Sequence, residues 1–410
     1  MFALALSLLL ALPAPDAFRP PPTQAPVTQA QASQPTPTQR LESLFTEAVQ
    51  AEWFAPAFLQ QVPLPQIQAL VAELGQSLGP LQQVETGVDG YRLIFAQGTV
   101  PAQIRLDGQG QIVGLFFGPP QVTVSIEDAV AAIATFPGEA SLLVLAGDEE
   151  LAAVNADRPL AVGSAFKLAV LAALQQAIAA DPPPGGAAPP LQWDTVVTLD
   201  PAWRSLPSGL LQDWPPGSAL TVETLATLMI ALSDNTATDA LMALVGRDAL
   251  EAIAPRNQPF LTTREFFALK NPANGDALAQ FRAGDLAAQR QVLAALATAP
   301  LPPASLFDGP PLALDVEWRF SARELCDLMA TVRSLPLMGV NPGVADPEQW
   351  AAIAFKGGSE PGVLNLTTAL TAADGRSYCV VATWNHPDQR LDETALSVLY
   401  SGLLRGLAQP

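Results

Sequence analysis

Histidine, cysteine and lysine are scarce in this chain of 410 residues, and each scarcity excludes a class of site. The single histidine, His386, excludes metal sites built from several histidines, and its polar Asn-His-Pro-Asp turn favours a surface position over a Ser-His-Asp triad. The two cysteines, Cys326 and Cys379, lack metal-ligand spacing and are too few for a disulfide framework. Because Cys326 is predicted on a helix and Cys379 in a buried strand, we favour two free thiols over a bridge. We expect neither a metal nor a cofactor.

Positive charge is the next shortage. The chain has 20 lysines and arginines against 39 acidic residues, which gives a net charge of -19 and a pI near 4.3. This charge repels nucleic acid phosphates and anionic lipid, so we expect a small-molecule or peptide partner and no nucleic acid. A length of 410 residues with 49% hydrophobic residues predicts two domains, each with its own core. The oligomeric state stays open.

The N-terminus carries a candidate export signal. Residues 1–12 are an apolar run followed by small residues and proline, which predicts a signal peptide over residues 1–17 and a secreted or periplasmic protein. The run is too short to span a bilayer, so we expect no stable membrane insertion after cleavage. It also lacks the usual Lys or Arg, and the alternative is a disordered apolar tail. Residues 18–39, rich in Pro, Gln, Thr and Ala, are predicted to be an extended linker.

A small α+β domain is predicted over residues 40–118. Helical patterns cover 41–58 and 65–78, and short apolar runs at 91–96, 102–106 and 112–117 are separated by hairpin-type turn signals. Helices packed on a curved antiparallel sheet would follow, an order similar to cone-shaped NTF2-like domains. The alternative is a packing module without a ligand.

A larger domain is predicted over residues 122–409. Strands at 141–146, 151–154, 363–370 and 378–384 lie near its two ends, and helices are predicted at 125–135, 164–179, 222–232, 235–245, 322–335 and 393–407. The Pro-rich stretch 181–190 is predicted to be a surface loop. One sheet closed by distant segments, with an all-helical insertion beside it, is the expected arrangement.

Two of the three lysines lie in short motifs of an acyl-transfer site. Ser164-Ala165-Phe166-Lys167 comes first, Ser233-Asp234-Asn235 follows, and Lys356-Gly357-Gly358 comes last. With 18 serines and three lysines, a Ser-x-x-Lys match is expected by chance only about 0.1 times. Lys270 lies outside these motifs and is predicted to be on the surface.

The spacing of Ser164 and Lys167 at the start of a helix lets the amine reach the hydroxyl. A serine hydroxyl needs a base, and without a usable histidine that base is a neutral Lys167. The pKa of Lys167 must therefore be lowered by burial, by the helix N-terminus and by a second cation, for which Lys356 is the candidate.

The other motif residues receive auxiliary roles. Ser233 would relay a proton, Asn235 would position a lysine or the substrate carbonyl, and Asp234 would hold the turn. The glycine pair ending at Gly358 lets a strand approach the substrate, and the N–H groups of Ser359 and Ser164 would form an oxyanion hole.

This ordered set resembles the class A serine β-lactamase and penicillin-binding-protein superfamily over roughly residues 122–409. The resemblance implies a β-lactamase/transpeptidase-like α+β fold, with an antiparallel sheet flanked by helices and an all-helical subdomain. The two-domain plan, with a small NTF2-like domain in front, is similar to the β-lactamase-like proteins of clavulanic acid gene clusters.

Three departures from the family pattern bear on activity. Gly357 stands where the family usually has a threonine or serine that grips a substrate carboxylate. No Glu-x-x-Leu-Asn supplies the class A deacylating base, and the nearest candidate, Glu265, is interpreted as the partner of an arginine. Ser208 stands near the position where the family often has an aromatic residue that gates the site. Trp203 or Trp214 could take that role instead, and the alternative is that both are core residues.

The sequence therefore predicts an exported serine hydrolase that is acylated at Ser164 by a β-lactam, amide or ester and then hydrolyses the acyl-enzyme. Alternatives within enzymes are a D-alanyl peptidase or an esterase with slow deacylation. A non-catalytic binding or sensor protein that keeps the fold is the alternative from another class.

Overall fold

A computed structural model describes residues 34–87, 90–118, 120–180 and 190–408. The described residues form two compact units, the first ending at Thr123 and the second beginning at Val124. The division lies close to the predicted domain boundary between residues 118 and 122. The predicted signal peptide, most of the linker and nearly all of the predicted loop 181–190 lie outside the described residues.

The first helix of the first unit begins inside the predicted linker 18–39, and three further helical segments follow it. In chain order these elements are α1 (Pro37–Thr46), the 3₁₀ turn η1 (Ala51–Trp53), α2 (Pro56–Gln61) and α3 (Leu64–Leu78). Thr36 and Gln39 cap α1 reciprocally, so ordered structure starts three residues before the predicted position 40. The single helix predicted over 41–58 is wrong, because α1 ends at Thr46 and Pro56, which lacks an N–H, opens a separate helix.

A five-stranded antiparallel sheet completes the first unit. Strands β1 (Leu81–Gly87), β2 (Gly90–Phe95), β3 (Gly98–Leu106) and β4 (Ile112–Phe117) are neighbours in that order, and β5 (Gln121–Val122) pairs with β3. Sequence reasoning missed β1, since Val84 is its only buried residue and a polar strand has no apolar signal. The NTF2-like comparison stays a prediction.

The second unit is built on a sheet that joins both ends of its chain. Its antiparallel order is β12 (Ala352–Glu360), β13 (Val363–Thr371), β14 (Ser377–Asn385), β6 (Glu139–Ala146) and β7 (Glu149–Val154). The predicted closure by distant segments is therefore confirmed. One long edge of β12 is left without a neighbouring strand among the described residues, and outside the sheet this strand contacts the 3₁₀ turn Gly163–Phe166 that holds Ser164.

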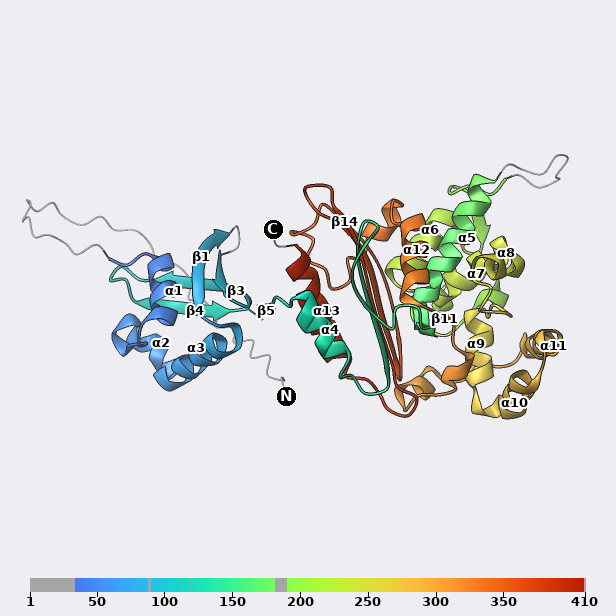
Figure 1. The fold of residues 1–410 in the computed structure, drawn as a ribbon, viewed down its shortest axis with the longest axis horizontal. Helices are drawn as coiled ribbons and strands as arrows, with labels where there is room; N and C mark the ends of the chain where they lie inside the picture. The colour runs from blue at the N-terminus through green and yellow to red at the C-terminus, as the bar shows by residue number, and fades with distance from the viewer. Residues whose placement is uncertain (1–33, 88–89, 119, 181–189, 409–410) are drawn as a thin grey trace, which may run out of the picture. The chain divides into compact units, whose positions relative to one another are not determined.

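Helices cover both faces of this sheet (Figure 1). On one face, α4 (Ile126–Ile133) and α13 (Glu393–Leu407) bury a core that includes Ile133, Leu396 and Tyr400. On the other, α12 (Ala322–Val332) packs on β13 and β14, and α5 (Lys167–Ala179) packs on α12. Nearly every residue of the first two turns of α5 is buried, so this helix forms the centre of the unit.

The helical part contains more helices than the sequence patterns distinguished. It comprises α6 (Val222–Ala231), α7 (Asn235–Val245), α8 (Arg247–Ile253), α9 (Thr263–Lys270), α10 (Gly275–Ala283) and α11 (Leu286–Leu296). Short strands pair as β8 (Leu160–Ala161) with β11 (Arg319–Phe320) and as β9 (Val196–Thr198) with β10 (Ala219–Thr221). The 3₁₀ turns of the unit are η2 (Gly163–Phe166), η3 (Pro201–Trp203), η4 (Leu211–Asp213), η5 (Pro272–Asn274), η6 (Ala304–Asp308), η7 (Leu314–Val316) and η8 (Pro336–Gly339). Among the helices of the described ranges, none combines the length and hydropathy needed to cross a bilayer.

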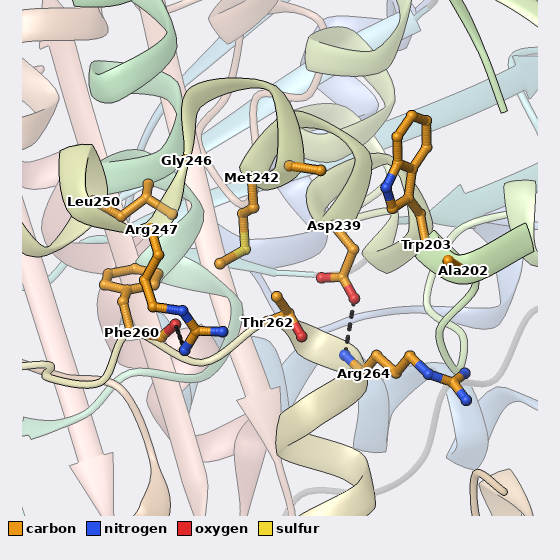
Figure 2. A pocket seen from close by; sticks show the side chains of 11 residues that line it. Ala202, Trp203, Asp239, Met242, Gly246, Arg247, Leu250, Phe260, Thr262 and Arg264 are labelled. Atoms are coloured by element: carbon orange, nitrogen blue, oxygen red, sulfur yellow. Dashed lines mark hydrogen bonds between the residues drawn. The ribbon is translucent and has the colours of Figure 1, made fainter. Parts of the chain in front are cut away.

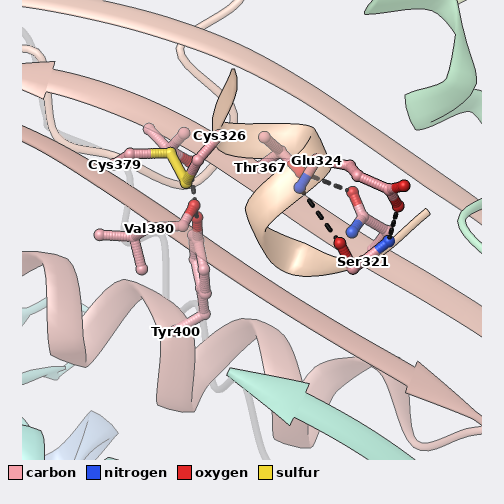
Figure 3. Close-up of a disulfide and its surroundings, with 9 residues drawn as sticks. Ser321, Glu324, Cys326, Thr367, Cys379, Val380 and Tyr400 are labelled. Carbon is pink, nitrogen blue, oxygen red and sulfur yellow. Dashed lines mark hydrogen bonds between the residues drawn. A yellow bond between two sulfur atoms is a disulfide. The ribbon is translucent and has the colours of Figure 1, made fainter. Parts of the chain in front are cut away.

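The expectation of two free thiols is wrong. Cys326 of α12 and Cys379 of β14 form a disulfide, with 6.0 Å between their Cα atoms (Figure 3). Helix α12 packs directly on β14, so residues 53 positions apart come face to face. Spacing along the sequence carries no information about this helix-on-sheet contact.

Candidate active site

The motif serine lies on a tight turn rather than in an α-helix. Strand β8 leads through Gly163, whose φ of 48° is left-handed, into η2, which holds Ser164; α5 begins only at Lys167. The N–H of Val162 donates to the carbonyl of Trp318 over 3.1 Å, which fixes the start of the turn. Ser164 is half-buried while its neighbours along the chain are buried, so its hydroxyl is the accessible group of this turn.

Lys167 is completely buried and is held by the second motif. Its amine lies 2.5 Å from the carbonyl oxygen of Ser233, 3.1 Å from Ser233 Oγ and 2.7 Å from Asn235 Oδ1. Burial, followed by the charge of Lys356, lowers the pKa of Lys167 well below its usual value, although Asp234 opposes the shift. This shift favours the neutral form of the Lys167 amine, which a general base requires.

Lys356 reaches the same hydroxyl from the sheet. It lies on β12 with 3% exposure, and its amine donates to Ser233 Oγ over 3.1 Å and to the carbonyl of Gly357 over 2.6 Å. Burial lowers the pKa of Lys356 to about 7. The two amines thus meet at Ser233, and within the described part of the chain the Ser164 hydroxyl has no hydrogen-bond partner of its own. The left-handed φ of 57° at Ser233 turns both its carbonyl and its hydroxyl toward Lys167.

Asp234 holds the turn, as predicted. Its buried carboxylate accepts hydrogen bonds from the N–H groups of Leu210, Leu211 and Ala237, and so caps α7 while fastening a neighbouring loop. A Cβ on Gly209 would lie 2.3 Å from this carboxylate, so the loop approaches only because that position is glycine.

The third motif presses its backbone against the Ser164 turn. A Cβ on Gly358 would lie 2.2 Å from the carbonyl oxygen of Val162 and 2.4 Å from the nitrogen of Ser164, and one on Gly163 would lie 3.2 Å from the nitrogen of Ser359. The segments carrying the two predicted oxyanion donors are therefore in direct contact. At Gly357, where the family pattern has a hydroxyl, a Cβ would lie 2.9 Å from the Phe355 ring.

Sequence reasoning missed one buried carboxyl beside the site. Asp239 follows Asn235 by four residues on α7, a spacing that puts both on one helix face and was a usable signal. Its carboxylate accepts from the N–H groups of Thr263 and Arg264 over 2.7 and 2.9 Å. Burial raises the pKa of Asp239 to about 7, against these hydrogen bonds.

Asp239 also lines a pocket of about 300 Å³ (Figure 2). The side chains of Trp203 and Met242 face the same space, and the Arg264 backbone closes one side through its bond to Asp239. The complete lining is Ala202, Trp203, Asp239, Met242, Ala243, Gly246, Arg247, Leu250, Phe260, Thr262 and Arg264.

Glu265 is a structural residue, as interpreted from the sequence. One carboxylate oxygen pairs with Arg247 over 2.6 Å, and the other accepts from the N–H of Thr262 in a capping box that starts α9. Both oxygens are therefore engaged away from the lysine pair.

The prediction of a surface position for Lys270 is wrong. Lys270 is 4% exposed and forms ion pairs with the buried Glu317 and, over 2.5 Å, with Glu360. Burial alone would lower the pKa of Lys270, but the two carboxylates outweigh it and raise that pKa. An isolated lysine in a sequence gives no sign of distant acidic partners, so only the fold could reveal this cluster.

Ser208 contacts the second motif directly, whereas the tryptophans and the histidine form no hydrogen bond with a motif residue among those described. Ser208 donates its hydroxyl to the carbonyl of Ser233 over 2.8 Å. Trp203 is half-buried against the helical core, whereas Trp214 is 38% exposed, so the core interpretation fails for Trp214. A gating role for either tryptophan stays a prediction. His386 accepts from the N–H groups of the two residues at 388 and 389, which makes it a turn residue as expected.

Comparisons with known proteins found one matching family model and several similar solved structures. The family described as "Beta-lactamase enzyme family" matches residues 123–299. A β-lactamase from Sphaerobacter thermophilus is 21% identical, and the alignment covers 70% of this chain and 98% of that chain with a TM-score of 0.44. PBP-A is 19% identical, with coverages of 69% and 94% and a TM-score of 0.46. An acyl-enzyme complex of a PBP-A mutant with penicillin G is 17% identical, with the same coverages and a TM-score of 0.42. No curated protein sequence matches the chain.

The matched segment contains two of the three motifs, from Ser164 to Asn235, in the predicted order. This part of the chain is therefore similar to the family described as a β-lactamase enzyme family.

Proposed function

We propose that this protein is an exported serine hydrolase whose Ser164 is acylated by β-lactams or by related amides and esters. The observation that carries the proposal is the convergence of two buried lysines on Ser233 Oγ, each 3.1 Å away and each with a lowered pKa, next to an accessible serine on a tight turn. Buried amines of lowered pKa are characteristic of general bases.

In the proposed acylation, neutral Lys167 takes the proton of Ser164 as Oγ bonds to the substrate carbonyl carbon. The N–H groups of Ser164 and Ser359 stabilise the negative oxygen of the tetrahedral intermediate. When the carbon–nitrogen or carbon–oxygen bond breaks, the proton passes from Lys167 through the Ser233 hydroxyl to the leaving atom. Lys356 polarises that hydroxyl, and Asn235 holds the Lys167 amine in place.

Deacylation is proposed to be the slow half of the reaction. The carboxylates near the motif residues are committed elsewhere: Asp234 to three backbone N–H groups, Asp239 to two, and Glu265 to Arg247 and the cap of α9. Activation of water would then depend on Lys167 or on Asp239, whose pKa of about 7 leaves it partly protonated at neutral pH.

Incubation with penicillin G followed by mass spectrometry of the intact protein tests this function. We expect a stoichiometric adduct that maps to Ser164 and is still present minutes after free penicillin is removed. Rapid loss of the adduct would identify an efficient lactamase instead. If neither penicillin nor a fluorophosphonate labels the folded protein, a non-catalytic binding protein is the better assignment.

Acylation is expected to depend on pH in a way that Lys356 controls. Only neutral Lys167 accepts a proton, so the labelling rate falls as the pH drops through the pKa of Lys167. Lys356→Met removes a positive charge that lowers this pKa. The pKa of Lys167 then rises, and the acid limb of the rate profile moves to higher pH. Labelling rates measured from pH 4 to 10 check the direction; an unmoved limb in the variant contradicts the pairing of the two lysines.

Export and the role of the small unit are part of the proposal. Disulfides persist mainly in oxidising compartments, so the bridge between Cys326 and Cys379 supports a secreted or periplasmic location. The first unit has its own core and is proposed to be a separate module of the enzyme.

A further inference from the structure

Lys270, Glu317 and Glu360 form a buried ionic cluster that the acylation chemistry leaves unused. Lys270 ends α9, Glu317 follows η7, and Glu360 ends β12. Their side chains are 1%, 0% and 12% exposed, respectively. Placing three ionisable groups in the interior has a large desolvation cost, so the cluster needs a reason beyond stability.

The cluster places one ammonium between two carboxyls. Lys270 forms ion pairs with both Glu317 and Glu360. Burial, followed by the neighbouring Glu360, raises the pKa of Glu317 well above its usual range. Oε2 of Glu317 has no hydrogen-bond partner in the described structure, so Lys270 is the contact that holds this carboxyl.

Each member of the cluster is connected to the turn that holds Ser164 through neighbouring residues. Glu317 is followed by Trp318, whose carbonyl accepts from the N–H of Val162, two residues before the serine. On β12, Glu360 shares a strand face with Gly358, because side chains alternate with a period of two. That face is the one on which a Gly358 Cβ would meet the Ser164 nitrogen.

A column of aromatic rings makes the third connection. The Lys270 ammonium lies 4.2 Å from the centroid of the Phe266 ring, Phe266 stacks on Trp318 at 4.6 Å, and Trp318 stacks on Phe166 at 3.8 Å. Phe166 is the residue between Ser164-Ala165 and Lys167. The contact between the buried Lys270 ammonium and the Phe266 ring is a cation–π interaction, which stabilises the end of the column farthest from Phe166.

We propose that the Lys270–Glu317–Glu360 cluster is a positioning device that holds the Ser164 turn against β12 and so aligns the nucleophile with the two oxyanion N–H groups. The three residues touch no reacting atom, and their effect reaches the reaction through Trp318, Phe166 and the β12 backbone. The inference rests on the proposed acylation of Ser164.

Lys270→Met is the variant of choice, because it removes the ammonium that joins Glu317 to Glu360. Rates of labelling by a fluorescent penicillin are measured over a range of concentrations in the full-length protein. We expect the maximal acylation rate to fall roughly tenfold or more, and the half-saturating concentration to change little, because misalignment affects the transition state more than binding. Lys270→Arg retains the cation and is expected to recover most of the rate.

Arg282→Met is the matched control. Arg282 forms an exposed ion pair with Asp315, only two residues before Glu317, and its loss should leave labelling unchanged. Thermal unfolding checks that each variant is folded. If Lys270→Met does not fold, Glu360→Gln replaces it, because it removes the ion pair to β12 while Lys270 keeps its pairing with Glu317, and the maximal rate should fall in the same way.

The outcomes separate the two proposals. Wild-type protein that resists both penicillin and fluorophosphonate overturns the proposed function. Wild-type protein that is labelled, together with a folded cluster variant that is labelled at the same maximal rate, overturns the positioning role alone. The positioning role is also contradicted if Lys270→Met raises the half-saturating concentration but leaves the maximal rate unchanged. The same holds if Lys270→Arg does not restore the maximal rate.

Discussion

Lys167→Ala is expected to lower the rate of Ser164 acylation by about 10⁴-fold, the scale seen when a nucleophile loses its base. Lys167 is the buried amine closest in sequence to Ser164, and its lowered pKa favours the neutral form that can accept a proton. Alanine at 167 leaves Asn235 Oδ1 without its amine partner, leaves Ser233 Oγ with Lys356 alone, and provides no atom to accept the serine proton. Labelling by a fluorescent penicillin, followed by peptide mapping, measures the loss.

The control for this variant is Arg333→Ala, which removes an exposed cation at the C-terminal end of α12 and should be labelled like wild type. Folding is compared by denaturant unfolding, since Lys167→Ala leaves a cavity and an unpaired acceptor at Asn235 Oδ1. A folded Lys167→Ala protein that is labelled within tenfold of wild type would assign the base to another group. Lys356 or Asp239 would be the next residues to replace, because both have a pKa of about 7.

The sequence predicted the parts of the site that depend on local order. Asn235–Val245 and Glu393–Leu407 match their predicted helices at both ends, because each begins at an Asp cap and carries an apolar face. The roles of Asp234 as a turn residue and of Glu265 as an arginine partner also followed from short-range patterns. These features depend on residues that are close together in the sequence, so they can be predicted from one sequence.

Features that depend on distant contacts were misread. Lys270 was expected at the surface, and its two partners lie 47 and 90 residues away. The sequence assigned a proton-relay role to Ser233, but it could not give the geometry of the two lysines there, which depends on the left-handed backbone of Ser233 and on where β12 lies. The polar strand Leu81–Gly87 was missed because its pairing with β2, not its composition, makes it a strand. In each case the deciding contact joins two helices or strands, and the sequence does not show which of these elements lie side by side.

The largest expected effect on stability comes from the disulfide, which was also unexpected. Cys326 and Cys379 close a loop of 53 residues between α12 and β14 (Figure 3). Restricting a loop of that length in the unfolded chain is worth about 4 kcal/mol in the chain-entropy account. Replacing both cysteines with alanine should therefore lower the free energy of unfolding by about 3–4 kcal/mol.

Urea unfolding of the wild type, with and without dithiothreitol, and of the Cys326→Ala/Cys379→Ala variant measures this effect. Reduced wild type and the double variant should unfold together, and both well before the oxidised protein. If reduction left the wild-type midpoint unchanged, the bridge would not form in the folded protein or would not restrain its unfolded chain. Because the loop contains β12 with Lys356 and Gly358, the bridge also ties the ends of the segment that carries the third motif to the sheet. At 25 °C the protein without the bridge should keep most of its acylating activity, because packing of α12 on β13 and β14 still holds the segment in place. After heating, it should lose more of that activity than the bridged protein does.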